Sequence, residues 1–345
     1  VLVSSTYIIA EIGCNHNGDP KLARKMVSTA QECGVDAVKF QTFSADALIS
    51  RYAPKAEYQI VTTGDSDSQL EMTKALELGH KDLLELVSFA RSLGLDAFST
   101  AFDLGSMDFL AQQEQKTWKI PSGEITNLPY LQQLTQIPVE RVLLSTGMAT
   151  LDEISTALEV LTSGGIEQGR IALLHCNTEY PTPDCDVNLL AIRALQDKYP
   201  GLEIGFSDHS VGALAAAAAV ALGASVIEKH FTLDKNLPGP DHKASATPEE
   251  LTELCQNIRR MELMRGSAEK KVTPSEAKNK IVARKSIVAS KPIARGEAFS
   301  EDNVTCKRPG NGISPMCWNE LMGITAMRDF EEDELIVAEG FSWQE

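Results

Sequence analysis

Short runs of apolar and β-branched residues alternate with amphipathic stretches along most of the chain. Each run ends in polar residues or glycine, which is the pattern of buried parallel strands. Before residue 235 there are eight such runs, at residues 7–13, 37–43, 97–102, 118–123, 141–147, 171–177, 203–209 and 226–232. Apolar residues at three-to-four spacing predict intervening and closing helices at residues 20–33, 81–93, 151–161, 187–198, 212–222 and 248–264.

This alternation predicts an α/β fold of the (β/α)8 TIM-barrel type. Eight strand and helix units within about 260 residues match the usual size of a closed barrel. A doubly wound open sheet would also alternate strands with helices, but the chain has no Gly-x-Gly-x-x-Gly turn after its first strand. The barrel is therefore the favoured fold.

Residues 44–79 interrupt the regular spacing. They are polar, include a Thr-Thr-Gly-Asp-Ser-Asp stretch, and are too many for a plain crossover. Long connections of this kind in compact domains usually serve function. We expect an elaborated loop over the mouth of the barrel, acting as a lid or contacting the substrate.

The pattern changes again after Met264, where a basic and polar segment precedes short apolar runs broken by Gly and Pro. Residues 289–300 and 326–337 echo each other, each with an apolar residue, a charged turn and an apolar run. We predict a catalytic barrel over residues 1–265, a linker over 266–280 and a small β-rich domain over 281–345.

Composition narrows the possible partners and compartment. With 43% hydrophobic and 23% charged residues among 345, the chain is of ordinary globular character. A net charge of −16 argues against nucleic acid or an anionic membrane as partner. Seven cysteines without a Cys-x-x-Cys pair argue against a disulfide framework and a structural zinc site. We also find no secretory signal and no membrane span, and expect a cytoplasmic protein.

Two histidines end successive predicted strands. His209 and His230 would be neighbours at the carboxyl ends of the strands, where barrel enzymes have their active sites. Two imidazoles with open positions beside them suit a catalytic divalent metal. The alternative is that both are hydrogen-bonded core histidines. His175 lies within a strand and is interpreted as structural.

The other polar residues at strand ends suggest an anion site with acid and base groups. Lys39 and Lys119 would point into the mouth, and a buried ammonium needs an anion. Strand-end hydroxyls would complete a phosphate or carboxylate cradle, unless they merely cap strands; they belong to Thr100, Ser122, Ser145 and Ser207. Carboxylates available as acid, base or sugar contacts are Glu11, Glu124 and, in a loop after the last strand, Asp241. The alternative for each carboxylate is structural: Glu11 or Glu124 could simply pair with a lysine, and Asp241 could simply form a turn.

Nine motifs spread over nearly the whole chain resemble those of the sialic acid synthase family. They are residues 10–18 (AEIGCNHNG), 38–42 (VKFQT), 119–124 (KIPSGE), 144–148 (LSTGM), 175–183 (HCNTEYPTP), 205–209 (GFSDH), 228–232 (EKHFT), 239–241 (GPD) and 307–312 (KRPGNG). The likeness is greatest to the bacterial N-acetylneuraminate synthases. The chain departs from the usual pattern at Ala101 and Cys185, neither of which carries a predicted role.

The resemblance implies a TIM barrel followed by an antifreeze-like (SAF) domain, a domain-swapped homodimer, and a role for each strand-end residue. His209 and His230 would bind a divalent metal, Mn²⁺ first and Mg²⁺ or Co²⁺ as alternatives. Glu11, Lys39 and Lys119 would be catalytic. Phosphoenolpyruvate would contact Lys39, Thr100, Lys119, Ser122, Ser145, Asn177 (or its neighbour Thr178) and Ser207. The amino sugar would contact Gln41, Glu124, Tyr180, Asp241 and, from the other subunit's small domain, Arg308.

The implied reaction joins phosphoenolpyruvate to the open-chain aldehyde of N-acetylmannosamine, with water adding and phosphate leaving by carbon–oxygen cleavage. Synthases of legionaminic and pseudaminic acid share this chemistry and are the alternative. A more distant alternative is a Schiff-base aldolase using Lys39, Lys119 or Lys229. A non-catalytic sugar- or ice-binding protein working through residues 281–345 is another, but would leave the barrel mouth without a role.

Overall fold

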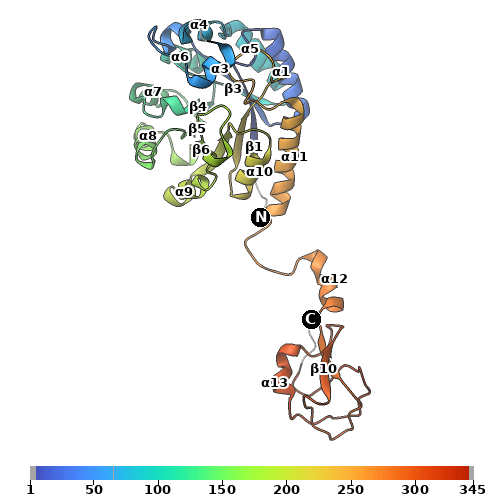
Figure 1. Ribbon diagram of the computed structural model, residues 1–345. Coiled ribbons are helices and arrows are strands. Elements are labelled where there is room, and N and C mark those ends of the chain that lie inside the picture. The colour runs from blue at the N-terminus through green and yellow to red at the C-terminus, as the bar shows by residue number, and fades with distance from the viewer. Residues whose placement is uncertain (1–4, 65, 342–345) are drawn as a thin grey trace. The chain divides into compact units, whose positions relative to one another are not determined.

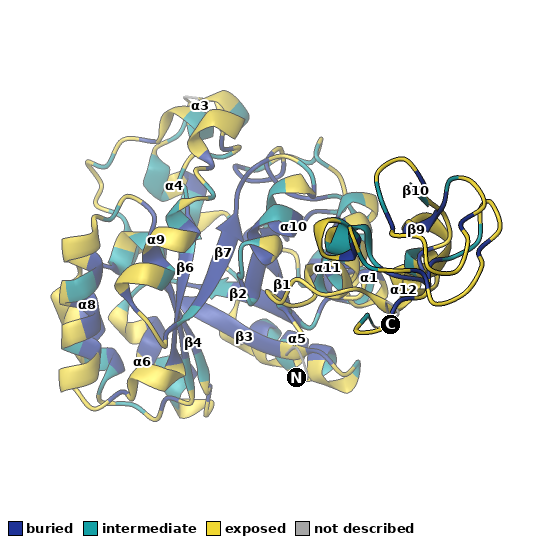
Figure 2. Cartoon of the chain, turned by 90° about the horizontal axis from the view of Figure 1, so that it is seen from below, coloured by how far each residue is buried: buried dark blue, intermediate teal, exposed yellow. Residues whose placement is uncertain are grey.

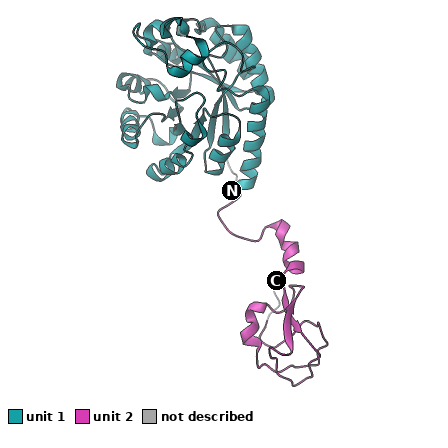
Figure 3. Ribbon diagram, viewed as in Figure 1, with its two compact units in different colours: residues 1–266 teal, residues 267–345 magenta. Residues whose placement is uncertain are grey.

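The structure is a computed structural model that describes residues 5–64 and 66–341. The chain divides into two compact units, Val1–Gly266 and Ser267–Glu345 (Figure 3). The division into barrel, linker and small domain at residues 265 and 280 stays a prediction. One difference is clear, since helix α12 (Pro274–Ala283) forms across the end of the predicted linker.

The first unit is an eight-stranded parallel barrel, as predicted (Figure 1). Its strands are β1 (Tyr7–Gly13), β2 (Ala37–Thr42), β3 (Asp96–Ala101), β4 (Thr117–Ile120), β5 (Arg141–Ser145), β6 (Ile171–Cys176), β7 (Glu203–Asp208) and β8 (Val226–His230). Strand β1 pairs with both β2 and β8, so the first and last strands are neighbours. Strands β3 and β4, at the two ends of the hydrogen-bonded order, lie against each other and complete the ring.

Helices surround this ring and turn one apolar face toward it. They are α1 (Pro20–Cys33), α5 (His80–Ser92), α6 (Leu104–Gln112), α7 (Leu128–Leu134), α8 (Leu151–Ser163), α9 (Ala191–Lys198), α10 (Leu214–Ala221) and α11 (Pro248–Arg265). Short 3-10 turns lie at η1 (Ser122–Glu124), η2 (Gln168–Arg170) and η3 (Asp184–Asp186). Figure 2 shows the strands buried and the outer faces of helices such as α8 exposed. None of the helices in the described ranges is both long enough and apolar enough to span a bilayer.

Local sequence signals explain where these helices begin and end. Helix α1 starts after Asp19, whose side chain accepts a hydrogen bond from the backbone N–H of Lys21, and it has Pro20 in its first turn. It ends at Gly34, where φ is +90°, a conformation that costs glycine little. Helix α8 starts with a reciprocal capping box between Thr150 and Glu153.

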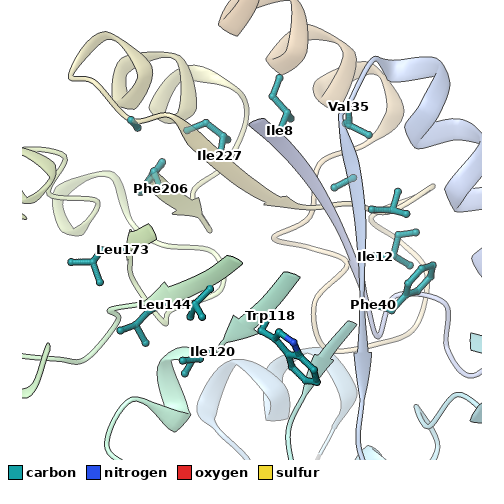
Figure 4. Packing of buried hydrophobic residues seen from close by; sticks show 14 of the residues in the cluster. Ile8, Ile12, Val35, Phe40, Trp118, Ile120, Leu144, Leu173, Phe206 and Ile227 are labelled. Carbon is teal, nitrogen blue, oxygen red and sulfur yellow. The ribbon is translucent and has the colours of Figure 1, made fainter. Parts of the chain in front are cut away.

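The alternation of side chains along each strand separates the core from the site. Ile8, Ile12 and Ile227 point outward into the cluster between strands and helices (Figure 4). Ile9 and Val226 belong to a smaller cluster inside the ring. Because the side-chain period of a strand is two residues, the next inward positions lie progressively closer to the mouth. The apolar interior thus supports a layer of polar residues above it.

The connection from β2 to α5 is an ordered helical insertion. Its helices are α2 (Ala45–Leu48), α3 (Glu57–Thr63) and α4 (Gln69–Lys74). The sequence predicted an elaborated loop here but no helices, because each segment is shorter than the window in which helical periodicity can be recognised.

The second unit is small and β-rich, with helix α12 at its start. Strands β9 (Ser286–Ala289) and β10 (Val304–Lys307) pair antiparallel, and η4 (Pro315–Cys317) leads into α13 (Trp318–Leu321). The two echoing segments lie against each other, since Ile293 pairs with Phe330 in an antiparallel bridge. Phe299 and Phe330 pack edge to face in the centre of this unit's own core.

Candidate active site

A cavity of about 490 Å³ lies among the residues at the carboxyl ends of the barrel strands. This volume suits a small metabolite or a pair of them. One part of the lining, the strand wall, comes from the strands and the segments that follow them, and the other, the insertion wall, comes from the β2–α5 insertion. Of the predicted site residues, those in its lining are Glu11, Lys39, Gln41, Thr100, Lys119, Ser122, Ser145, Tyr180, Ser207, His209, His230 and Asp241.

Two buried lysines dominate the floor of this cavity. Lys39 Nζ lies 2.6 Å from Glu11 Oε2 and donates to Thr100 Oγ1 at 2.9 Å. Lys119 Nζ lies 2.6 Å from Glu228 Oε1. The other oxygen of Glu228, Oε2, is 3.7 Å from Lys39 Nζ, so Glu228 stands between the two ammonium groups. Each lysine is held by a carboxylate, and both face the cavity.

The same contacts set the charges of these groups. Burial opposes ionisation of Glu228, but Lys119 and Lys39 hold its pKa well below the usual range. Burial also opposes the charge on Lys39, yet Glu11 and Glu228 raise the pKa of this lysine. Burial raises the pKa of Glu11 to about 7 despite the opposing effect of Lys39. Near neutral pH the floor therefore carries Lys39 as a cation and one carboxyl group able to exchange a proton.

The hydroxyl groups predicted to hold an anion line the same cavity as these lysines. Ser207 Oγ donates to Glu228 Oε1 at 2.8 Å. Ser122 Oγ accepts from the backbone N–H of Gly147 at 3.0 Å and lies 3.1 Å from Cys176 Sγ. Within the described chain, the buried Ser145 Oγ has no hydrogen-bond partner. An uncommitted buried hydroxyl in the same cavity as two lysines suits a bound anionic oxygen.

The two histidines are neutral, and not all of their ring nitrogens are engaged in close hydrogen bonds in the part of the chain that the structure describes. The ring centroids of His209 and His230 are 5.3 Å apart. His209 Nδ1 bonds the carbonyl of Asn177, which leaves Nε2 facing Ser207 Oγ at 3.4 Å. Burial lowers the pKa of His209 to about 4, and burial together with His209 holds the pKa of His230 well below its usual value. Neutral imidazoles are the form that binds metals.

These residues fit a divalent ion with open positions. His230 Nδ1 is buried and finds no hydrogen-bond partner among the described residues; Asp241 Oδ2 is 3.8 Å away. The hydrogen bond between His209 Nδ1 and the Asn177 carbonyl fixes the orientation of the ring, as such bonds do for imidazoles that bind metals. In residues 5–64 and 66–341 no group of three or more His, Cys, Asp or Glu side chains is arranged around one ion. A catalytic metal here would complete its shell with water or substrate.

The residues predicted to contact the sugar fall into two groups. Gln41 Nε2 donates to Glu11 Oε1 at 2.8 Å, and Tyr180 stacks on His209 with centroids 4.2 Å apart. Asp241 is buried, accepts from Cys14 Sγ at 3.4 Å, and has its pKa raised by burial to about 6. These three residues line the cavity.

Three other predicted residues lie outside the cavity lining. Glu124 lies on η1 and accepts from Asn127 Nδ2 at 2.6 Å. Asn177 accepts from the N–H of Glu179 at 2.8 Å with its side chain, so Thr178 takes its place in the wall. Arg308 belongs to the second unit, where its Nε donates to the carbonyl of Ala283 at 3.1 Å.

Sequence reasoning missed Glu228, although the sequence contains a signal for it. Val226, Glu228 and His230 alternate along β8, so a strand that turns His230 inward turns Glu228 inward as well. Lys229 points to the other face and is paired there with Asp208 at 2.9 Å. The lysine named for a Schiff base on this strand is therefore not in the cavity lining.

Comparison with known proteins adds the family context. The NeuB family model matches residues 26–270, and the SAF domain model matches residues 284–342. The chain is 51% identical over 334 residues to an N,N'-diacetyllegionaminic acid synthase of Campylobacter jejuni, covering 97% of this chain and 99% of the relative. It is 45% identical over 319 residues to one of Legionella pneumophila, covering 92% and 89%.

A solved structure gives a similar result. The crystal structure of an N-acetylneuraminic acid synthetase from Leptospira borgpetersenii, in complex with citrate, superposes with a TM-score of 0.69. The identity is 32%, and the match covers 80% of this chain and 90% of that one.

Proposed function

The chain belongs to the NeuB family, whose members are phosphoenolpyruvate-dependent sugar-acid synthases, and we propose that it makes N,N'-diacetyllegionaminic acid. The substrates are phosphoenolpyruvate, 2,4-diacetamido-2,4,6-trideoxymannose and water, and inorganic phosphate is the second product. The observation that carries the chemistry is the pair of buried, carboxylate-held lysines beside two neutral histidines in one cavity.

The choice of sugar differs from the first choice made from the sequence, which was N-acetylmannosamine. The motifs that suggested N-acetylneuraminate synthesis lie around the strand ends, where all members of the family perform the same reaction. Identity of 51% to a legionaminic acid synthase, against 32% to an N-acetylneuraminic acid synthetase, supports the alternative. N-acetylmannosamine is the second candidate substrate.

In the proposed reaction, Lys39 and Lys119 bind the carboxylate and phosphate of phosphoenolpyruvate. Thr100, Ser122, Ser145 and Ser207 supply neutral donors around the same anion. Because these donors are positioned before the substrate arrives, they stabilise developing charge without reorganisation. Glu228 remains between the lysines and pairs with both of them.

The bond changes require one proton acceptor and one proton donor. The methylene carbon of phosphoenolpyruvate attacks the aldehyde carbon, and water adds to the former enol carbon. Collapse of the tetrahedral adduct breaks its carbon–oxygen bond and releases phosphate. Glu11, with its pKa raised by burial, takes a proton from the attacking water and returns one toward the new hydroxyl.

The metal part of the proposal assigns a divalent ion to His209 and His230. Such an ion, Mn²⁺ by resemblance to the family, would act as a Lewis acid toward the aldehyde oxygen. The chain's own contribution is to keep both imidazoles neutral and to orient His209 through the carbonyl of Asn177. The proposed homodimer, with Arg308 of each chain serving the sugar site of the other, extends the family resemblance.

A Schiff-base aldolase is the weaker alternative. Its lysine must lose its proton to attack a keto acid. Lys39 is instead paired with Glu11 and Glu228, which raise its pKa, and Lys119 is paired with Glu228 at 2.6 Å. Both contacts favour the cation that binds an anion.

The first experiment measures phosphate release from phosphoenolpyruvate with Mn²⁺ and either sugar. We expect kcat/KM to be at least about tenfold higher with 2,4-diacetamido-2,4,6-trideoxymannose than with N-acetylmannosamine, since pocket contacts to substituents discriminate by this order. A chelator should abolish release with both. Release with N-acetylmannosamine alone would restore the N-acetylneuraminate assignment, and release with neither would refute the proposed chemistry.

A further inference from the structure

The two walls of the cavity differ in character. The strand side contributes the charged groups, including Glu11, Lys39, Lys119, Glu228 and Asp241. The residues that line the cavity from the described part of the β2–α5 insertion are all uncharged. Besides two glutamines, an alanine and a threonine, they are Leu48, Ile49, Tyr58, Met72 and Leu76. One wall thus suits anions and the reacting groups, and the other suits methyl and amide groups.

The insertion is an ordered structure whose helices are held together by a buried lysine. Lys55 Nζ donates to Thr63 Oγ1 at 3.2 Å, to the carbonyl of Gly64 at 2.9 Å and to Asp67 Oδ1 at 2.8 Å. The Lys55 side chain is only 2% exposed, and these three bonds use its three donors. They tie the end of α3 to the start of α4, the helix that carries Met72.

Further contacts fix the insertion to the barrel. The backbone N–H of Ser44 donates to Asp103 Oδ2 at 2.9 Å, next to the start of α6. The N–H of Ala45 donates to Glu77 Oε1 at 2.6 Å, which joins the first and last parts of the insertion. Leu48 and Leu76 are therefore held in the wall by the structure on both sides of them.

An aromatic stack links this wall to the reacting end of the site. Tyr58 of α3 packs on Tyr180 with ring centroids 5.3 Å apart, and Tyr180 stacks on His209 at 4.2 Å. A sugar with its aldehyde beside the histidines would lie in the same cavity as the uncharged residues of the insertion. The wall and the reacting groups thus face one bound molecule.

The physical consequence concerns hydroxyl groups at the far end of the sugar. A hydroxyl pressed against Leu48 or Leu76 loses water without gaining a partner, whereas a methyl group there is favourable. An acetamido group adds apolar surface and an amide that suits glutamine side chains. The candidate sugars differ at these positions, because the trideoxy sugar has a methyl and a second acetamido group where N-acetylmannosamine has hydroxyls.

We propose that the insertion at residues 44–79 determines sugar specificity, with Leu48 and Leu76 selecting a sugar whose far end carries methyl and acetamido groups. This inference rests on the proposed function and deepens it. It assigns to the insertion the choice among substrates, and to the strand ends the reaction that all of them undergo.

The test compares kcat/KM for the two sugars in wild type and in Leu48→Asn and Leu76→Asn. Both side chains are partly exposed, and asparagine is close to leucine in size. We expect each variant to lose about tenfold in kcat/KM for the diacetamido sugar and to change little with N-acetylmannosamine. Leu84→Asn on α5, where the leucine is 36% exposed and outside the cavity lining, is the matched control and should keep both values.

A second measurement needs no variant. The wild type should use 2-acetamido-2,6-dideoxymannose about tenfold better than N-acetylmannosamine, because these sugars differ only in one hydroxyl. If the wild type prefers the diacetamido sugar but both variants keep that preference, the inference is wrong and the proposed function stands. If the wild type prefers N-acetylmannosamine, or uses neither sugar, both proposals fail.

Discussion

Replacing Lys119 with methionine is expected to lower kcat/KM for phosphoenolpyruvate by about 10³-fold. The change removes one of two buried cations proposed to bind the substrate's anionic groups, and a single preorganised electrostatic contact contributes about 10²- to 10³-fold. It also leaves Glu228 buried with Lys39, 3.7 Å away, as its remaining ion-pair partner. A carboxylate left in this position repels the incoming anion, which adds to the loss. Initial rates of phosphate release over a range of phosphoenolpyruvate concentrations give the value.

The same change should lower the melting temperature by about 10 °C, because breaking a buried ion pair costs about 3–5 kcal/mol. Adding Glu228→Gln to Lys119→Met removes the unpaired charge, and we expect much of the stability to return while kcat/KM stays low. Recovery of the rate in the double variant would mean that Lys119 serves only to hold Glu228. Lys116→Met is the matched control, since Lys116 pairs with Glu140 at the surface and both side chains are 63% exposed.

The barrel could be predicted because apolar side chains fill the outward positions of strands such as β1, β4 and β5. Ile8 and Ile12 alternate with Ile9 and Glu11, so the outward face of β1 reads as core and the inward face changes from apolar to polar near the mouth. This change occurs at the carboxyl ends of several strands, which is where the fold assembles its active site. The same residue pattern therefore predicted both the eight strands and the location of the site.

Single side chains after the strands were less predictable than those on them. Thr100 and Ser207 lie on strands, and strand parity fixes the direction of both. Asn177 follows β6 in a turn. Its side-chain oxygen accepts a hydrogen bond from the N–H of Glu179, and its carbonyl bonds His209 Nδ1. Glu124 likewise accepts a hydrogen bond from the side-chain amide of Asn127, three residues further along. Local hydrogen bonds of this kind depend on backbone geometry that sequence periodicity does not contain.

Glu228 illustrates a different failure. A glutamate in an apolar strand is expected to avoid burial, so the sequence pattern alone does not predict Glu228 in the site. Its burial is possible because Lys39, Lys119 and Ser207 surround it with donors from three other strands. The insertion wall is unpredictable for a related reason, since Lys55 and Asp67 become partners only once the chain has turned between α3 and α4.

Removing either histidine is expected to abolish tight Mn²⁺ binding and to lower the rate of phosphate release by about 10³-fold. The two imidazoles are the protein ligands proposed for the ion, so His209→Ala and His230→Ala each leave one ligand, and a Lewis acid supplies several kcal/mol of transition-state stabilisation. Isothermal titration with Mn²⁺ on metal-free protein measures the binding directly. A chelator should reduce the wild-type rate to the level of the variants.

Stability distinguishes the two variants from each other in the absence of metal. His209→Ala leaves the carbonyl of Asn177 without its partner, which costs about 1 kcal/mol beyond the loss of packing. His230 Nδ1 makes no hydrogen bond within the described residues, so His230→Ala avoids that cost and should melt at a higher temperature than His209→Ala. His175→Gln is the control, because His175 bonds the carbonyl of Val187 outside the cavity lining and should bind Mn²⁺ as the wild type does. Unchanged Mn²⁺ binding in both alanine variants would place the ion elsewhere, and it would refute the histidine site.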